Sequence, residues 1–168
     1  MSERMKVLAF SREAGGAEAI APICKTLNRD DDLLLIASGY AVNLFNHQKL
    51  KPIEFHYNEK VLEDLCHNKY GTLPERLLTS AASLPHIDMT ERQLWQWAHR
   101  KNILSVAVLD QWQNYALRFS GQTPNERLVY FPDKICEMDD LAKNEMIEDG
   151  VPLERIVITG QPAFERLQ

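Results

Sequence analysis

The sequence predicts an α/β fold with a doubly wound, mostly parallel sheet and helices on both faces, of the Rossmann-like kind. The first observation is length, because 168 residues suit one hydrophobic core. The second is the alternation of short, β-branched apolar runs with longer amphipathic segments. The third is that the runs at 33–36 and 105–109 are almost wholly apolar, as strands are when helices cover both faces of a parallel sheet. Together they indicate one βαβ domain over residues 1–168.

Apolar runs define the expected strands. Six of them are predicted as strands, and a further run at 134–138 is a candidate for another. The segments between the runs have the length and periodicity of helices. In chain order the six predicted strands lie at 7–10, 33–37, 53–55, 77–79, 103–109 and 156–159.

The strongest helix signal lies at 89–94. Thr90 and Gln93 have the spacing of a capping box, which predicts a helix over about 91–100. Trp95 and Trp97 are two residues apart in this helix, so their side chains point in nearly opposite directions. We expect one tryptophan in the core and the other exposed or at an interface.

Two further helices are defined by their ends. The acidic start of 139–148 suits the positive end of the helix dipole, and Gly150 supplies a stop. Pro22 falls among the apolar positions of the first helix, and proline is tolerated in a first turn. The first helix is therefore expected to begin near Glu18 or Ala19.

Charge and hydropathy exclude two classes of function. The net charge is -5 and no long basic run is present, so the phosphate neutralisation on which nucleic-acid binding rests is not expected. No stretch approaches the roughly 20 apolar residues that span a bilayer, and the N-terminus lacks an apolar segment of signal-peptide length. We expect a cytoplasmic protein that neither spans a membrane nor binds nucleic acid.

Neither the cysteines nor the histidines predict a metal site. Cys24, Cys66 and Cys136 are far apart and lie in apolar or helical patterns, so buried, unreactive thiols are expected. The five histidines have no metal-ligand spacing such as HExxH. We expect no metal and no cofactor.

The segment from Ser11 to Glu18 is the first candidate for chemistry. It joins the first strand to the first helix, at the edge where parallel α/β sheets bind ligands. Gly15 and Gly16 would let the backbone pass close to a ligand, and the helix N-terminus behind them offers N–H groups to an anion. The segment matches neither GxGxxG nor the Walker A spacing, and a tight turn alone would also explain the glycines.

A second candidate, 110–119, follows the longest apolar strand and begins at the same edge. Asp110, followed by Asn114, Tyr115 and Arg118, could hold a sugar or a phosphate-bearing acceptor. If the segment is helical, its aromatic residues form an apolar face and need no ligand. A third candidate is the turn at 159–162. Gln161 is the only residue of this turn whose polar side chain is long enough to contact a ligand.

Two parts of the sequence resemble a known superfamily. They are the first strand, glycine segment and proline-bearing helix at 6–22, and the closing segment formed by 132–136 and 156–164. Both resemble the N-terminal half of GT-B proteins, which include two-domain glycosyltransferases and UDP-N-acetylglucosamine 2-epimerases. The resemblance implies an acceptor-side domain that lacks its C-terminal, nucleotide-sugar-binding partner domain.

The resemblance implies glycosyl transfer to a cell-envelope saccharide or related acceptor, with a nucleotide sugar as donor. Asp110 or Glu13 would act as the general base. Arg12, Gly15, Gly16, Asn114, Tyr115, Arg118 and Gln161 would bind substrate.

Two alternatives stay open. One is a stand-alone, non-catalytic module that binds a nucleotide or a partner protein at the same edge. The other is half of a nucleotide-sugar 2-epimerase or hydrolase. The epimerases carry a Gly-x-Arg-Pro-Glu signature after the first strand, and this sequence lacks the proline between Arg12 and Glu13. The resemblance therefore favours glycosyl transfer over epimerisation.

Overall fold

A parallel sheet forms the centre of the computed structural model, which describes residues 4–30 and 32–167. In these residues the sheet has seven strands in the order β3-β2-β1-β4-β5-β6-β7, and every neighbouring pair is parallel. All six predicted strands are present, and the candidate at 134–138 is also a strand. The strands are β1 (Val7–Ser11), β2 (Leu33–Ala37), β3 (Ile53–Glu54), β4 (Arg76–Ser80), β5 (Leu104–Val108), β6 (Lys134–Glu137) and β7 (Ile156–Ile158).

Helices cover both faces of this sheet, which confirms the predicted fold class. The α-helices are α1 (Ala14–Arg29), α2 (Tyr40–His47), α3 (Glu59–Tyr70), α4 (Thr90–Arg100), α5 (Tyr115–Arg118) and α6 (Asp140–Asp149). Short 3-10 helices are η1 (Pro124–Glu126), η2 (Leu153–Arg155) and η3 (Pro162–Leu167). No helix in the described part of the chain is long and apolar enough to cross a bilayer.

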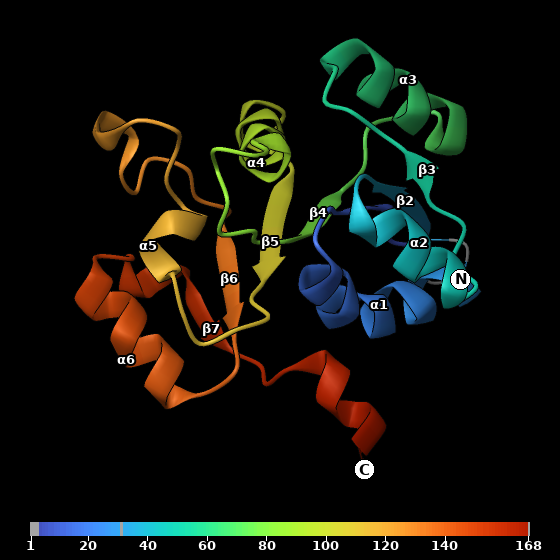
Figure 1. Ribbon diagram of the computed structural model, residues 1–168. Helices are drawn as coiled ribbons and strands as arrows, with labels where there is room; N and C mark the ends of the chain where they lie inside the picture. The colour runs from blue at the N-terminus through green and yellow to red at the C-terminus, as the bar shows by residue number, and fades with distance from the viewer. Residues whose placement is uncertain (1–3, 31, 168) are drawn as a thin grey trace.

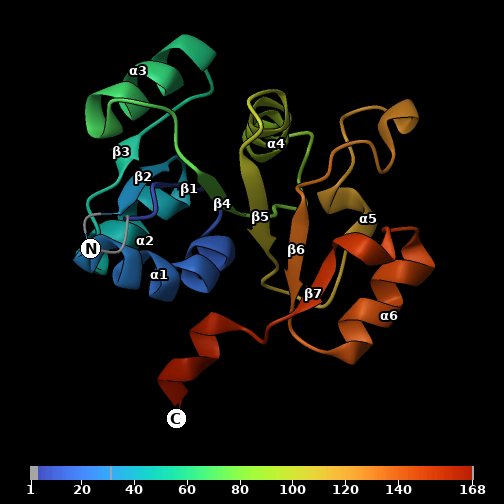
Figure 2. The ribbon, with the colours of Figure 1, turned by 180° about the vertical axis from the view of Figure 1, so that it is seen from behind.

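The core has two parts because successive strand residues point to opposite faces. Leu8 and Phe10 of β1 pack on the face that α3, α4, α5 and α6 cover, whereas Val7 and Ala9 pack on the face of α1 and α2. From β7 the chain returns across the second face, so that η3 lies beside α1 (Figures 1 and 2).

The N-termini of α1 and α4 differ from the prediction. Helix α1 begins at Ala14, so Gly15 and Gly16 lie in its first turn and Pro22 lies in its interior. Pro22 lacks an N–H, and the helix continues past the hydrogen bond that is missing there. Helix α4 is confirmed, but Met89 is its N-cap, and the Thr90 hydroxyl donates to Asp88 Oδ1 at 2.9 Å instead of capping the helix.

Both tryptophans of α4 are buried within the chain, so the prediction that one of them is exposed or at an interface was wrong. Trp95 faces the sheet, where its Nε1 donates to Thr79 Oγ1 at 2.9 Å. Trp97 lies against α3, where its Nε1 donates to Glu63 Oε1 at 3.1 Å. Helix α4 is covered on two sides because it packs on the sheet and α3 lies beside it on the same face.

The topology creates a crevice between β1 and β4. From β1 the chain adds β2 and β3 on one side and then crosses over, so that β4 pairs with the other edge of β1. The connections after β1 and β4 therefore leave toward opposite faces. In open α/β sheets, ligands bind at such a switch point, beyond the carboxyl ends of the strands.

Candidate functional site

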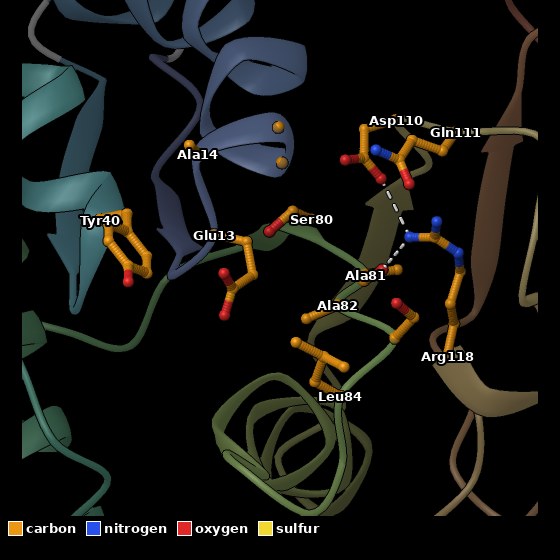
Figure 3. Close-up of a pocket in the computed structure, with 13 residues that line it drawn as sticks. Glu13, Ala14, Tyr40, Ser80, Ala81, Ala82, Leu84, Asp110, Gln111 and Arg118 are labelled. Carbon is orange, nitrogen blue, oxygen red and sulfur yellow. Dashed lines mark hydrogen bonds and ion pairs between the residues drawn. The ribbon is translucent and has the colours of Figure 1, made fainter.

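A cavity of about 430 Å³ opens at this switch point (Figure 3). Its walls come from the segments that follow β1, β2, β4 and β5, four strands that end at the same edge of the sheet. A volume of this size accommodates a small ligand. The lining residues are Glu13, Ala14, Gly15, Gly16, Tyr40, Ser80, Ala81, Ala82, Ser83, Leu84, Asp110, Gln111 and Arg118.

The two glycines let α1 approach the loops after β4 and β5. A Cβ on Gly15 would lie 2.3 Å from Asp110 Oδ2, and a Cβ on Gly16 would lie 2.4 Å from Ser80 Cβ. The Ser80 hydroxyl in turn lies 2.7 Å from the Ser11 hydroxyl. The glycines lie in a regular helical turn, so close approach accounts for them and a tight turn does not.

Asp110 and Arg118 form a largely buried ion pair at the base of the cavity. Arg118 Nη1 donates to Asp110 Oδ1 at 2.9 Å, and the side chains are 2% and 15% exposed respectively. Arg118 also donates to the carbonyls of Ala81 and Gln113. One guanidinium therefore ties the ends of β4 and β5 together and fixes the carboxylate, as the dashed lines in Figure 3 show.

Glu13 supplies the second carboxylate of the cavity. Its side chain is 27% exposed and forms an ion pair with Arg12. Arg12 itself is not among the lining residues. Its side chain packs on Gly39, where a Cβ would lie 3.1 Å from Arg12 Cγ. In this structure Arg12 therefore contacts Glu13 and the turn before α2, and its contact with a substrate stays a prediction.

Besides Arg12, three further predicted binding residues are not among those that line the cavity. Tyr115 is buried and its hydroxyl donates to Glu145 Oε2 at 2.9 Å. Gln161 is buried and its Nε2 donates to the Leu109 carbonyl at 3.1 Å. Asn114 has a left-handed backbone, φ 57°, at the start of α5, with an exposed side chain. Their contact with a ligand stays a prediction.

The helix after β5 is much shorter than a helix over 110–119 would be. Only Tyr115–Arg118 are helical. Trp112 therefore does not join the core with Tyr115 and Phe119. It is 42% exposed and stacks on Phe164 at 6.2 Å between ring centroids.

Two charged residues that support the cavity carry no recognisable sequence signal. Arg92 donates to the carbonyls of Ala82 at 2.9 Å, Leu117 at 2.8 Å and Ser120 at 2.5 Å. Both carboxylate oxygens of Glu91 accept from the Ala82 N–H at 3.2 Å. Burial raises the pKa of Glu91 to about 7, against the charge of Arg92, which lowers it. The first turn of α4 thus holds the segment after β4 in place.

Tyr40 and the segment from Ser80 to Leu84 were also missed. Tyr40 begins α2 and is 70% exposed. The rule that strands end at one edge could have identified both, because Tyr40 follows β2 and the segment follows β4.

The three cysteines lie in buried or half-buried positions. Among the described residues, no group of three or more His, Cys, Asp or Glu is placed to hold a metal ion. Cys24 and Cys66 are buried, and burial raises the pKa of both thiols to about 12. Cys136 is half-buried.

Comparison with known proteins identifies the fold. No protein-family model and no curated protein match this chain. The S. aureus MnaA–UDP complex matches with a TM-score of 0.63 at 16% identity, over 97% of this chain and 47% of that one. UDP-GlcNAc 2-epimerase from Methanocaldococcus jannaschii matches with a TM-score of 0.62 at 12% identity, over 96% and 47%. Anabaena Alr3699/HepE with UDP matches with a TM-score of 0.60 at 13% identity, over 94% and 44%.

The chain spans about half the length of the solved structures that it matches. At these identities the likeness concerns the fold. The chain has the Rossmann-like fold of one half of a GT-B-like protein, which confirms the expectation drawn from its first and last segments.

Proposed function

We propose that this chain is the acceptor-side half of a nucleotide-sugar enzyme of the GT-B kind, and that a C-terminal partner domain holds the nucleotide of the donor. The observation that carries the proposal is the switch-point cavity with the carboxylates of Asp110 and Glu13 on its wall. Sugars present hydroxyl donors, and carboxylates accept hydrogen bonds from them. The fold neighbours support a nucleotide-sugar role, since two Anabaena HepE complexes hold UDP and UDP with glucose.

The reaction we propose is glycosyl transfer to an acceptor hydroxyl, with a cell-envelope saccharide as the acceptor class. Asp110 is the general base and Glu13 holds a second hydroxyl of the acceptor. Arg118 donates a hydrogen bond to Asp110 Oδ1, so Asp110 Oδ2 is the oxygen that accepts the proton of the acceptor hydroxyl. The acceptor oxygen forms the new bond at the anomeric carbon. The bond from that carbon to the nucleotide breaks, and the leaving nucleoside diphosphate keeps the electron pair.

The second candidate is half of a nucleotide-sugar 2-epimerase. The UDP-GlcNAc 2-epimerases among the fold neighbours favour it. The missing proline between Arg12 and Glu13 counts against it. In that reaction the same carboxylates would act on the sugar of the nucleotide itself and no acceptor would be consumed.

Saturation-transfer NMR with the 168-residue chain tests the proposal. Oligosaccharides of cell-envelope composition should receive saturation from the chain, and free UDP should receive little. Asp110→Asn should weaken oligosaccharide binding at least severalfold. Asp64→Asn is the matched control, because Asp64 is an exposed carboxylate that pairs with Lys60 on α3, away from the cavity lining. Absence of saccharide binding, or equal binding by both variants, would contradict the proposal.

Incubation with UDP-sugars separates the two reactions. The chain alone is expected to turn over little, because the donor side of the cleft belongs to the partner domain. Transfer at a normal rate by the chain alone would contradict the half-enzyme proposal. An epimerised nucleotide sugar that forms without an acceptor would favour the second candidate.

A further inference from the structure

Tyr40 lines the candidate site, and the proposed chemistry gives it no role. It stands where α2 begins, and at 70% it is the most exposed large apolar side chain in the part of the chain that the structure describes. Apolar surface in contact with water costs free energy, and a ligand that covers such surface recovers the cost. The ring of Tyr40 is therefore a contact surface for a ligand that carries an apolar face.

The backbone at Tyr40 is held by the segment that also carries Glu13. The Ala41 N–H donates to the Arg12 carbonyl at 2.9 Å. Gly39, the N-cap of α2, has φ 54°, a conformation that favours glycine, and the Arg12 side chain packs against it. A tyrosine has only two side-chain torsions to fix, so contact with a ligand costs little conformational entropy. Tyr40 thus stands at a fixed place on the cavity wall.

The cavity is polar at its base and apolar at its mouth. Ser80 and Arg118 at the base are each 2% exposed, whereas Tyr40 and Leu84 are 70% and 37% exposed. A sugar ring has a matching distribution, with hydroxyl groups around its edge and C–H bonds on its faces. The face of an aromatic ring is negative and attracts groups with a positive partial charge, such as these C–H bonds. The mouth of the cavity therefore suits the face of a sugar ring, and the base suits hydroxyl groups.

Tyr40 lies across the cavity from Asp110, with Glu13 and Ser80 between them (Figure 3). The ring of Tyr40 and the carboxylate of Glu13 extend in the same direction, and the ring does not extend toward Asp110. Tyr40 follows β2 and Asp110 follows β5, with β1 and β4 between these strands. Strands are spaced by about 4.8 Å, so β2 and β5 lie roughly 14 Å apart. A ligand that contacts both side chains is therefore longer than one sugar ring.

We propose that Tyr40 is the platform of a distal acceptor subsite: the acceptor is a saccharide of at least two linked rings, one of which stacks on Tyr40. The ring with the reacting hydroxyl lies at Asp110, and Glu13 accepts a hydrogen bond from a hydroxyl between the two. This inference rests on the proposed function, because it assumes that the acceptor lies in this cavity. It adds the length of the acceptor and makes Tyr40 the residue that selects for length.

The length dependence of binding tests the proposal. The probes are glucose, mannose and N-acetylglucosamine, each as the monosaccharide and as its linear disaccharide and trisaccharide. In at least one series, wild-type affinity should rise from the monosaccharide to the longer saccharides. Tyr40→Ala should lower the affinity for the longer saccharides by roughly three- to tenfold, as loss of one aromatic contact does. It should leave the affinity for the monosaccharide unchanged.

Two further variants distinguish stacking from other effects. Tyr40→Phe keeps the ring and should keep the affinity for the longer saccharides. Phe164→Ala is the matched control, because Phe164 is also an exposed aromatic residue, at 49%, and does not line the cavity. It should bind as the wild type does. A loss in Tyr40→Phe as large as that in Tyr40→Ala, or the same loss in Phe164→Ala, would overturn the proposal.

Proton NMR of the bound saccharide gives a direct sign of stacking. The C–H protons of one ring should move upfield on binding to the wild type, through the ring current of Tyr40, and should not move in Tyr40→Ala. Because Tyr40 is exposed, this variant should keep the urea midpoint of the wild type. Upfield shifts that persist in Tyr40→Ala would overturn the proposal.

The same titrations separate this inference from the proposed function. If Asp110→Asn weakens saccharide binding and Tyr40→Ala does not, the platform role fails and the proposed function stands. If Tyr40→Ala weakens the monosaccharide as much as the trisaccharide, Tyr40 does not select for length and the inference fails alone. If no saccharide of any length binds, the proposed function and the platform role both fail.

Discussion

At the scale of single residues, the missing Cβ atoms of Gly15 and Gly16 determine how closely α1 meets its neighbours. Asp110 fills the space beside Gly15, and Ser80 fills the space beside Gly16. Asp110 cannot swing away from Gly15 without leaving Arg118. The helix start, the ion pair and the cavity wall therefore depend on one another.

Replacing Gly15 by alanine should destabilise the protein by about 1–3 kcal/mol, as overpacking does in tight sites. In an Asp110→Ala background the clash is gone, and alanine is favoured over glycine in a helix by about 1 kcal/mol. The same substitution should then be neutral or stabilising. Denaturant unfolding of the wild type, the two single variants and the double variant measures the coupling between Gly15 and Asp110. An equal effect of Gly15→Ala in both backgrounds would show that the clash is absent.

At the scale of elements, the first turn of α4 does more than begin a helix. Glu91 and Arg92 bind the main chain of the segments after β4 and around α5, and both are 1% exposed. These segments contribute Ala82 and Arg118 to the cavity. Helix α4 therefore shapes the site without lining it.

Arg92→Lys should destabilise the protein by roughly 2–4 kcal/mol, because one ammonium cannot replace a planar guanidinium at three carbonyls. Arg100→Lys is the control, since Arg100 forms an exposed ion pair with Glu59. Exposed pairs of this kind contribute about 0–1 kcal/mol. Thermal and urea unfolding distinguish the two, and similar losses in both variants would contradict the role of Arg92.

The helix caps give a further prediction at this scale. Asn58 accepts from the Val61 N–H at the start of α3, and Asp139 accepts from the Ala142 N–H at the start of α6. Replacing either by alanine should cost about 0.5–2 kcal/mol in the free energy of unfolding. Asp139→Ala should cost more, because Asp139 Oδ2 also accepts from Trp112 Nε1 at 3.0 Å. Asp140→Ala, which removes no cap, should have a smaller effect in the same urea titration.

Local patterns predicted the elements well and their partners poorly. Continuous apolar runs identified the strands, and chain order brought Gly15 and Asp110 to one edge of the sheet. The burial of Trp97 depends on α3, which lies far away in sequence, and no periodicity within α4 could show it. Glu91 and Arg92 likewise have the charge pattern of a solvated helix start. Their partners are main-chain atoms of distant loops, and such partners leave no signal in the amino-acid sequence.

At the scale of the whole molecule, two buried carboxyl groups should make stability depend on pH. Burial raises the pKa values of Glu91 and Glu137 from 4.5 to about 7 in the folded protein. Between these pH values the folded state holds more protons than the unfolded state. The free energy of unfolding therefore falls as the pH rises from 4.5 to 7, and it stays lower above 7.

Each carboxyl group should lower the free energy of unfolding at pH 8, relative to pH 4.5, by on the order of 3 kcal/mol. Glu91→Gln and Glu137→Gln should each flatten the pH profile, and the double variant should flatten it further. Glu148→Gln, at an exposed position, should leave the profile unchanged. Urea unfolding at a series of pH values provides the measurement. A wild-type profile that rises between pH 5 and 7 would contradict the prediction.

The crossover from β3 to β4 also has a consequence for how the chain folds. The β4 strand pairs with β1, a strand that lies more than sixty residues earlier in the sequence. Before β4 is added, one edge of the wholly buried β1 strand has no partner. An unpaired apolar edge invites pairing with another chain. We expect fragments that end before residue 76 to aggregate, and the cavity to form only after β4 has closed that edge.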